Sequence, residues 1–580
     1  MLLHIGTLFL AIAVTPWLVS RIILPRQSLI VTLAGWGVAM TAMNVGVPII
    51  LHLLTIAITA DSLAWSHMLL AGIVGVGFAV GKRCGLVGVL HGSSDRLLLV
   101  SAILFAVFVI PFSHIAGVDT YKWQDLAGNV AVEQRISWFI HPLSLFGYTP
   151  RSYSSAQPLI LATIQMLGHT GVDWGFYILS VACGMAGLSG AWVLGRHLFK
   201  SDTAATWFGI LYVFSPVFMR YNYWATGRGL MLALLPVYLL ILLKLGEFFA
   251  HTWRDALCRV LLLLGHDKAW PSSGLQQVDL DRHRWVSFLL LLPAWLTLSL
   301  LLAMAHKAGL VGVILIPVLF IVSPILVLLR GRWGLIAATL LALSAGLLLV
   351  EGNLLTLTYR LLTRFGWLLP LFILALISVP ERFAVKSFRA MLAAGLAALV
   401  LSCTPEMYGA MLALPFMAFV AAIGLEKLSV RPYGRLVLIL IPALAIVINQ
   451  TRDSPGESLY RAACFIEKKN PRGPFRIEAP GAARRQIQAY VSGCPRFTVQ
   501  ADPKPTIELN RPPLWTGSPI HDAQAWTHYF RLLFKLSGAS TDWYGTGNKV
   551  YYVTVDREGS VPPQAKRLFQ DRNVEVFESP

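Results

Sequence analysis

Long apolar stretches separated by short polar ones dominate the chain from Met1 to about residue 450. About fourteen of these stretches reach 18 to 30 residues, long enough for a helix to cross a hydrocarbon core of about 30 Å. A segment inside the bilayer must satisfy its own backbone hydrogen bonds, which favours helices. The pattern therefore predicts a polytopic α-helical membrane protein with about fourteen transmembrane helices.

The pattern changes after residue 450. The short runs RIEAPG, RFTVQ and KVYYVTVD are typical of strands, while RRQIQAYVSGC has a helical period. Pro and Gly residues separate these runs. The sequence therefore predicts two domains, a transmembrane domain over residues 1–450 and a soluble α/β domain over residues 451–580.

The composition agrees with a membrane protein. Of 580 residues, 56% are hydrophobic and 13% are charged, against about 25% charged residues in a typical soluble domain. The mean hydropathy is +0.65. A net charge of +18 could suggest nucleic-acid binding, but most Lys and Arg residues lie in short loops between apolar stretches, where they direct membrane insertion. We therefore expect membrane lipids, and no nucleic acid, among the partners.

The distribution of basic residues predicts the orientation of the chain. If successive loops alternate between the two sides of the membrane, one set carries more than twice as many Lys and Arg residues as the other. The positive-inside rule assigns the richer set to the cytoplasm. We therefore expect a multi-pass protein of the plasma (inner) membrane, with the N-terminus, residues 115–155 and the C-terminal domain on the extracytoplasmic side.

Two of the six cysteines fall in the predicted extracytoplasmic tail. An oxidising compartment allows Cys464 and Cys494 to pair, so we expect a disulfide between them. The remaining cysteines occur singly in membrane or cytoplasmic segments, without a spacing typical of metal ligands.

Residues 115–155 interrupt the apolar pattern with a loop of charged and aromatic residues. Asp119 follows the stretch LLLVSAILFAVFVIPFSH by about five residues, and Lys122 lies within one helical turn of it. A partly desolvated carboxylate at the membrane surface can act as a general base on a hydroxyl group. The same residues also fit a solvated connection whose Trp and Tyr side chains belong to the interfacial aromatic belt. The residues alone leave both interpretations open.

Several segments, taken in order, resemble the GT-C superfamily of membrane glycosyltransferases. VDTYKWQDLA follows a membrane helix, and LFGYTPRSYSSAQPLILATIQML resembles the family's Tyr- and Pro-rich entry into a short apolar helix. ATWFGILYVFSPVFMRYNYWATGRGLMLALLPVYLLILLKL resembles the family's helix, outer turn and helix. TPEMYGAMLALPFMAFVAAIGLEKL resembles a later helix, which in many relatives starts from an Arg-Tyr pair. The order of these parts carries the resemblance, which implies a GT-C-like transmembrane domain with a catalytic outer loop at 115–155.

The resemblance implies transfer of a sugar, such as a mannosyl or arabinosyl group, from a polyprenyl-phosphate-linked donor to a glycan, lipid or protein acceptor. Such transfer usually inverts the anomeric carbon. Asp119 matches the acidic residue of the first outer loop, which is the family's catalytic base. The chain departs from the family in the three extra apolar segments before the catalytic helix. It also lacks a DxD in the second outer loop, so we expect no metal and no other cofactor.

Without a metal, a phosphate leaving group needs fixed cations, and Arg binds phosphate oxygens in a bidentate way. Arg220, Arg228, Arg360 and Arg364 lie on the predicted outer side, against the positive-inside trend. We expect Arg228, Arg360, Arg364 and Lys122 to bind the donor phosphate, although snorkelling to lipid headgroups explains such arginines equally. The residues expected to contact the acceptor or the sugar are Tyr148, Arg151, Tyr153, Tyr221, Glu351, Glu406 and Tyr408.

Two other classes of protein share part of this pattern. A flippase or transporter of lipid-linked glycans also has about fourteen helices, but such proteins tend to show repeated halves and broken helices with charges at the midplane. A glycan polymerase or ligase uses similar substrates but has its large outer loop late in the chain. Because the large loop here is early and a soluble tail follows, the glycosyltransferase is the preferred hypothesis.

Overall fold

We analysed a computed structural model of the chain. It describes most of residues 1–469, together with 475–479, 497–498, 544–545 and most of 549–579. The longer segments that it does not describe are 81–92, 110–117, 264–276, 323–352, 379–407 and 480–543, apart from isolated positions within these segments.

The first membrane-spanning helix contains a π-helical turn that its neighbour stabilises. Helix α1 (Leu2–Phe9), the π-helix η1 (Leu10–Val14) and α2 (Thr15–Ile23) run on as one apolar helix beside α3 (Leu29–Leu53). Trp36 Nε1 donates to the Ile12 carbonyl at 2.7 Å, and Asn44 Nδ2 donates to the Ala11 carbonyl at 3.1 Å. Polar side chains of α3 thus supply hydrogen bonds to carbonyls that a π-turn leaves poorly paired.

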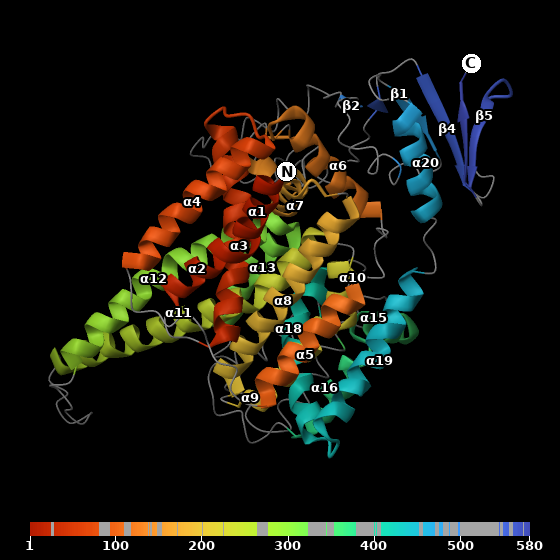
Figure 1. Cartoon of the computed structure of the whole chain (residues 1–580). Helices are drawn as coiled ribbons and strands as arrows, with labels where there is room; N and C mark the ends of the chain where they lie inside the picture. The colour runs from red at the N-terminus through yellow and green to blue at the C-terminus, as the bar shows by residue number, and fades with distance from the viewer. Residues whose placement is uncertain are drawn as a thin grey trace, which may run out of the picture.

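A cluster of polar side chains joins the start of the chain to two later helices. His4 Nε2 lies 2.8 Å from Asp61 Oδ1 at the start of α4 (Ala60–Val80). His4 Nδ1 lies 2.7 Å from Nε2 of His169, which follows α7 (Ala156–Gly168). These contacts hold α1, α4 and α7 together at the end of the bundle where the N-terminus lies (Figure 1).

The centre of the bundle is built from apolar helices that are largely buried. They are α8 (Val172–Phe199), α9 (Asp202–Val213), α11 (Gly227–Leu263) and α18 (Tyr408–Lys427), while α5 (Ser93–Val109) packs against α8 and α9 and exposes its other side. The spanning window of α18 is 94% buried, and it is enclosed by α9, α16 and neighbouring helices. A helix that is apolar all round belongs in the interior of such a bundle.

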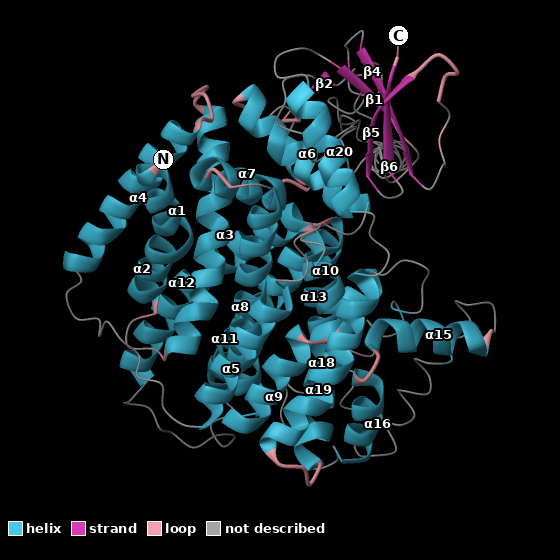
Figure 2. Cartoon of the chain, turned by 45° about the vertical axis from the view of Figure 1, so that its right-hand side comes forward, coloured by secondary structure: helices cyan, strands magenta, loops and turns pink. Residues whose placement is uncertain are grey.

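Helices α12 (Gln277–Ala305), α13 (Lys307–Val322), α15 (Leu354–Phe365), α16 (Leu368–Ser378) and α19 (Pro432–Thr451) complete the described membrane part. The chain bends by 100° between α15 and α16. As a result α15 lies nearly across the direction of α18 and α19 (Figure 2). Gly366, with φ of +51°, forms this corner, where a side chain would be strained.

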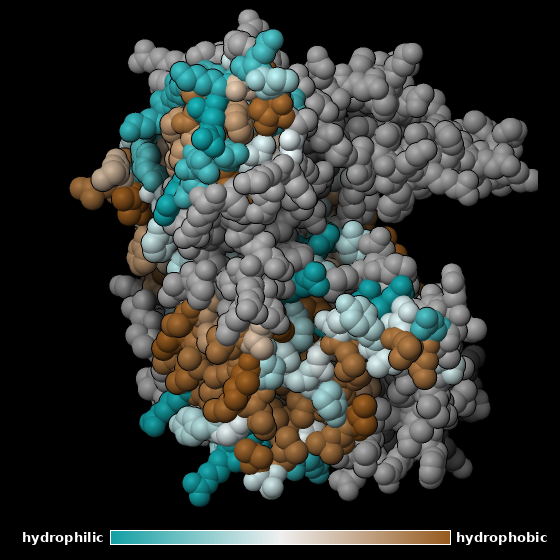
Figure 3. Space-filling view, turned by 90° about the vertical axis from the view of Figure 1, so that its right-hand side faces the viewer, coloured by the Kyte–Doolittle hydropathy of each residue, from teal (hydrophilic) through white to brown (hydrophobic). Residues whose placement is uncertain are grey.

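The described residues include six helices long and apolar enough to cross a membrane, or seven if the bent pair α15–α16 counts as one span. Shorter apolar helices lie at Arg96–Val109, Ala156–Gly168, Leu289–Ala305, Ala308–Val318 and Pro432–Ile446. Hydrophobic residues form a broad area over the lower half of one face, with hydrophilic residues gathered above it (Figure 3). The protein is therefore a helical membrane protein, whereas a total of about fourteen spans stays a prediction from the sequence.

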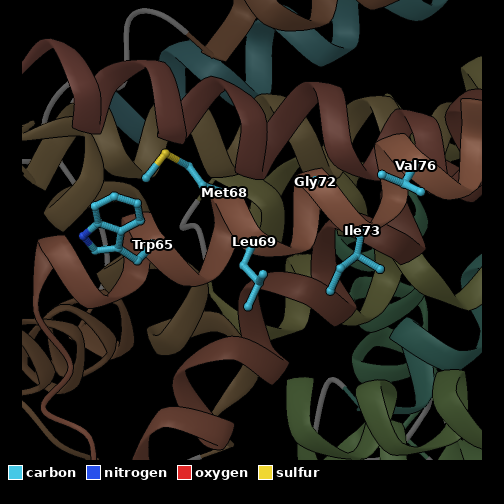
Figure 4. Close-up of a pocket in the computed structure, with 6 residues that line it drawn as sticks. All are labelled: Trp65, Met68, Leu69, Gly72, Ile73 and Val76. Carbon is cyan, nitrogen blue, oxygen red and sulfur yellow. The ribbon is translucent and has the colours of Figure 1, made fainter.

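The outward face of α4 shows how this surface is built. A shallow pocket on this helix is lined by Trp65, Met68, Leu69, Gly72, Ile73 and Val76 (Figure 4). The Trp65 and Leu69 side chains are both 68% exposed. These positions repeat at helical spacing and none carries a charge, as expected for a helix face that contacts lipid.

After the last described membrane helix, the chain forms a small mixed sheet with one helix against it. The strand order is β1 (Phe475–Glu478), β4 (Lys549–Val555), β6 (Val574–Glu578), β5 (Lys566–Asp571), with β1 parallel to β4 and the other pairs antiparallel. A second pair joins β2 (Phe497–Thr498) to β3 (Tyr544–Gly545). Helix α20 (Gly456–Lys469) contributes Leu459 and Ile466 to a hydrophobic cluster separate from the bundle.

The strands predicted from RIEAPG, RFTVQ and KVYYVTVD are confirmed at β1, β2 and β4. The helix predicted from RRQIQAYVSGC lies outside the described residues, apart from Ile487. The sheet lies toward the same end of the bundle as the N-terminus (Figures 1 and 2).

Candidate functional site

The segment predicted as a loop over 115–155 contains a helix. Helix α6 (Val118–Glu133) is followed by a short 3₁₀-helix, η3 (Pro142–Leu145), and an isolated bridge between Phe146 and Ser154. Trp123, Leu126, Ala127 and Val130 are all buried, and their spacing of three and four residues is that of one helix face. This helical spacing of buried residues would have identified α6 from the sequence, but the charged residues between them mask it.

Polar contacts fix α6 against α7. Gln124 and Gln165 exchange two side-chain hydrogen bonds, of 3.2 Å and 2.8 Å, across the two helices. Further along, Trp138 Nε1 donates to Ser155 Oγ at 2.9 Å just before α7 begins. Asp119 is the second residue of α6 and lies one turn before Trp123, while the side chains of Asp119 and Lys122 are outside the description.

Trp123 links α6 to the start of α11 through a glycine. A Cβ atom at Gly227 would lie 2.9 Å from Trp123 Cη2 and would overlap the Ala305 carbonyl. A Cβ atom at Gly229 would lie 2.8 Å from the Asn222 Cα. The two glycines of the sequence Gly-Arg-Gly therefore let three backbone segments meet closely around the intervening residue, Arg228.

The end of α10 (Pro216–Tyr223) is anchored beside this point. Asn222 Nδ2 donates to the Ser180 carbonyl at 2.8 Å, and Ser180 Oγ donates to the Asn222 carbonyl at 2.9 Å. Thr226 Oγ1 donates to the Tyr221 carbonyl at 3.3 Å. These bonds satisfy backbone groups of the turn between α10 and α11, which would otherwise be unpaired in an apolar region.

Three arginines from three helices act electrostatically on Tyr221, and we call Arg220, Arg228 and Arg364 the arginine cluster. The Arg228 guanidinium lies 5.1 Å from the Tyr221 ring centroid and 6.0 Å from that of Tyr408. Burial raises the pKa of Tyr221, whereas the positive charges of Arg228, Arg220 and Arg364 act in the opposite direction. Tyr221 is therefore a neutral, buried ring within the field of three cations.

Helix α15 brings Arg364 to this position. Arg364 lies in the last turn of α15, is only 6% exposed, and donates to the Ser402 carbonyl. The corner at Gly366 that ends α15 packs against Pro216, the first residue of α10. Arg360 lies one turn earlier on α15 and is half-buried.

His306 completes the cluster and was not identified from the sequence. It is 6% exposed and joins α12 to α13, where its Nε2 lies 3.3 Å from Arg228 Nε. Its ring centroid is 5.2 Å from that of Tyr408, the first residue of α18. The sequence could have indicated His306, because it is a polar residue within the largely apolar stretch AMAHKAG.

The structure therefore brings together Arg228, Arg364, Tyr221 and Tyr408, which the sequence had proposed from three separate segments. The predicted contact residues Tyr148, Arg151, Tyr153, Glu351 and Glu406 lie outside the described residues.

The predicted disulfide lies in the tail. Cys464 is exposed on α20, and Cys494 is outside the description, so their pairing stays a prediction. Among the described residues, no group of three or more His, Cys, Asp or Glu side chains is placed to hold a metal ion.

The arginine cluster suits an anion with several oxygens, because guanidinium groups offer fixed N–H donors and permanent charge. Tyr221, Tyr408 and His306 add flat rings that hold Arg228 in place. No protein-family model matches the sequence, and a comparison with curated proteins finds no match.

Proposed function

We propose that this chain is a GT-C type membrane glycosyltransferase. It moves a sugar from a polyprenyl-phosphate-linked donor to a glycan, lipid or protein acceptor. The observation that carries the proposal is the convergence of Arg220, Arg228 and Arg364 on Tyr221, next to the helix that contains Asp119. Cations gathered in the apolar part of a membrane protein are costly, which favours a function in binding an anion.

The surroundings of the cluster suit a lipid-linked phosphate. Leu355, Tyr359 and Leu362 are 82%, 69% and 49% exposed on α15, the same helix that buries Arg364. One side of α15 thus offers apolar contacts for a polyprenyl chain, while its last turn offers a guanidinium for the phosphate. A helix lying across the bundle direction with an apolar outer face is typical of a membrane interface (Figure 2).

The reaction requires one base and one anion site. The carboxylate of Asp119 accepts the proton of an acceptor hydroxyl, and the hydroxyl oxygen attacks the anomeric carbon of the donor with inversion. The bond from that carbon to the phosphate oxygen breaks, and its electron pair stays on the phosphate. The arginine cluster stabilises the added negative charge, as preorganised cations do for developing anions.

The topology follows from the same hypothesis. A domain over 1–450 with about fourteen helices spans the plasma (inner) membrane, with α6 and the cluster toward the extracytoplasmic side. The α/β domain over 451–580 lies on that side and helps to bind the acceptor. The N-terminus and the sheet at the same end of the bundle support an even number of crossings (Figure 1).

The test is a pair of isosteric variants in α6. Asp119→Asn should lower the transfer of labelled sugar from polyprenyl-phosphate donors in membrane vesicles by about 10²- to 10⁴-fold, because it removes the general base. Asp125→Asn, in the same helix, is the matched control and should retain most activity. Near-native turnover of the Asp119 variant would remove this residue from the mechanism.

A transporter of lipid-linked glycans is the second candidate, favoured by the 100° break between α15 and α16. Broken helices are common where transporters bind their substrates. Proteoliposomes containing a lipid-linked glycan separate the two functions. Movement of the intact glycan across the membrane without sugar transfer would support the transporter.

A further inference from the structure

Three titratable side chains form one hydrogen-bonded series at the end of the bundle that carries the N-terminus, and we call Asp61, His4 and His169 the Asp–His–His triad. Asp61 Oδ1, on α4, lies 2.8 Å from His4 Nε2, on α1. His4 Nδ1 lies 2.7 Å from Nε2 of His169, which ends α7. The His4 side chain is 15% exposed, whereas that of Asp61 is 78% exposed and His169 is exposed. The triad thus has a sheltered middle and two ends that reach the surface.

The carboxylate determines where the hydrogens of both rings lie. An ionised carboxylate only accepts hydrogen bonds, so His4 Nε2 carries a hydrogen and donates it to Asp61. In a neutral His4 ring Nδ1 then accepts, and His169 Nε2 donates to it. A neutral His169 ring with its hydrogen on Nε2 has its basic nitrogen at Nδ1. Every contact in the triad is satisfied, and the basic nitrogen belongs to the exposed residue.

The triad can take up one proton without losing a contact. When His169 Nδ1 binds a proton, the hydrogen on its Nε2 moves to His4 Nδ1. His4 is then an imidazolium that donates to His169 and to Asp61 along the two observed contacts. Its positive charge lies beside the Asp61 carboxylate in a sheltered position, where the attraction is stronger than in bulk water. This hydrogen pattern is suited to accepting and passing on protons.

The backbone at His169 indicates that its side chain has a use. His169 has φ of +48°, in the left-handed region where helices most often end with glycine. A side chain at such a position is strained, and strained residues occur mainly where their side chains function.

Helices α6 and α7 pack side by side in opposite directions. Gln124 of α6 and Gln165 of α7 exchange two hydrogen bonds. Trp138, just after the end of α6, donates to Ser155, just before the start of α7. The end of α6 therefore lies beside the start of α7, and the start of α6 lies beside the end of α7.

This packing places the triad at the level of the proposed base. Asp119 comes five residues before Gln124, about 7.5 Å along α6 at 1.5 Å per residue. His169 comes four residues after Gln165, about 6 Å along the direction of α7. The backbone of Asp119 and the end of the triad therefore lie at nearly the same height in the bundle.

We propose that the Asp–His–His triad is a proton relay that takes up the proton released by sugar transfer. The O–H bond of the acceptor breaks and its proton goes to the Asp119 carboxylate. Water carries the proton on to His169 Nδ1, where an N–H bond forms while the hydrogen on Nε2 passes to His4. Asp119 returns to the ionised form that the next transfer needs. This inference rests on the proposed function and assigns His169, His4 and Asp61 to it as relay residues.

Two substitutions of His169 separate a relay from a structural tie between helices. The Gln side chain in His169→Gln places an amide N–H near the position of Nε2, so it keeps the link to His4 but cannot bind a proton. His169→Gly suits the backbone and leaves a space that free imidazole can enter. Gln would replace a residue that only ties α7 to α1, and imidazole in solution would not restore such a tie.

The assay is the transfer of labelled sugar from polyprenyl-phosphate donors in membrane vesicles. We expect both variants to lower turnover about tenfold or more, less than the loss of the base itself because water takes up part of the protons. Added imidazole should restore turnover in His169→Gly and leave His169→Gln unchanged. Farnesyl phosphate, a short polyprenyl phosphate, should bind to both purified variants in detergent as it does to the wild type, because the relay acts after the donor has bound.

The other outcomes are distinct from one another. Wild-type turnover in His169→Gln would overturn the relay, and a loss of turnover in Asp119→Asn in the same assay would leave the proposed function standing. A loss in His169→Gly that imidazole does not restore, or a loss of farnesyl phosphate binding in both variants, would show that the triad only holds helices together. Absence of sugar transfer by the wild-type chain would overturn the proposed function and the relay with it.

Discussion

At the scale of single residues, burial distinguishes arginines that the sequence treats alike. Arg360 and Arg364 occupy the same face of α15 one turn apart, and both were proposed to bind phosphate. Only Arg364 is nearly fully buried and acts on Tyr221 among the described contacts. An arginine enclosed in an apolar bundle requires a permanent counterpart or an anionic ligand, whereas a half-exposed arginine can reach lipid headgroups.

This difference gives a prediction for the two arginines. Arg364→Lys keeps the charge but loses the planar donor group, so farnesyl phosphate binding should weaken about tenfold. The matched variant Arg360→Lys should change binding by less than about threefold. Titration of both purified variants measures the effect, with thermal unfolding as the control for the lost contact to Ser402. A larger loss for Arg360 would move the phosphate to the outer part of α15.

At the scale of elements, the site depends on how closely α6, α11 and the end of α12 approach one another. The approach is possible because Gly227 has no side chain, which leaves room for the Trp123 ring and the Ala305 carbonyl. The amide pair of Gln124 and Gln165 then holds α6 against α7. A well-packed interior has little free volume, so an added methyl group must displace one of these helices.

Gly227→Ala should therefore lower the stability of the protein by about 1 to 3 kcal/mol and reduce sugar transfer, because it forces α6 away from Arg228. Gly246→Ala, in the same helix, is the matched control, since no atom lies within 4 Å of a Cβ there. That change should be neutral or slightly stabilising. Thermal unfolding in detergent and the transfer assay report the two effects. Equal behaviour of the two variants would contradict the close contact at Gly227.

At the scale of the whole molecule, the N-terminus and the C-terminal sheet lie toward the same end of the helical bundle (Figure 1). The sheet and α20 have their own hydrophobic cluster, so this end of the chain does not rely on the membrane helices for its core. Cys464 lies on the exposed side of α20, where a reagent can reach it. The side of the membrane on which this thiol lies therefore also tests the proposed orientation of α6.

We predict that a membrane-impermeant maleimide labels Cys464 and Cys494 on intact cells only after mild reduction, because the proposed topology places the two thiols outside the cell, where an oxidising compartment allows them to pair. Cys258, in a predicted cytoplasmic segment, is the internal control and should be labelled only after permeabilisation. Mass spectrometry of the labelled peptides gives the result. Labelling of Cys464 without reductant would exclude the disulfide. Labelling only after permeabilisation would place the tail, and Asp119 with it, on the cytoplasmic side.

The class of protein and the strands of the tail could be predicted because they depend on local patterns. Apolar runs of spanning length and the alternation in KVYYVTVD are local signals that survive folding. The helix α6 was missed because its polar residues hide the buried face formed by Trp123, Leu126 and Val130. Arg228 and Arg364 were noticed as charges on an unexpected side of the membrane, yet nothing local shows that they meet.

The sequence by itself determined that the chain is a helical membrane protein, because crossing a bilayer requires long apolar segments whatever their partners. It also indicated which basic residues are out of place. Only the tertiary structure decided that Arg220, Arg228 and Arg364 all act on Tyr221, and that Arg228 Nε lies 3.3 Å from His306 Nε2. These contacts join residues up to about 140 positions apart, and their formation depends on the packing of helices at Gly227 and Gly366, which no local pattern encodes.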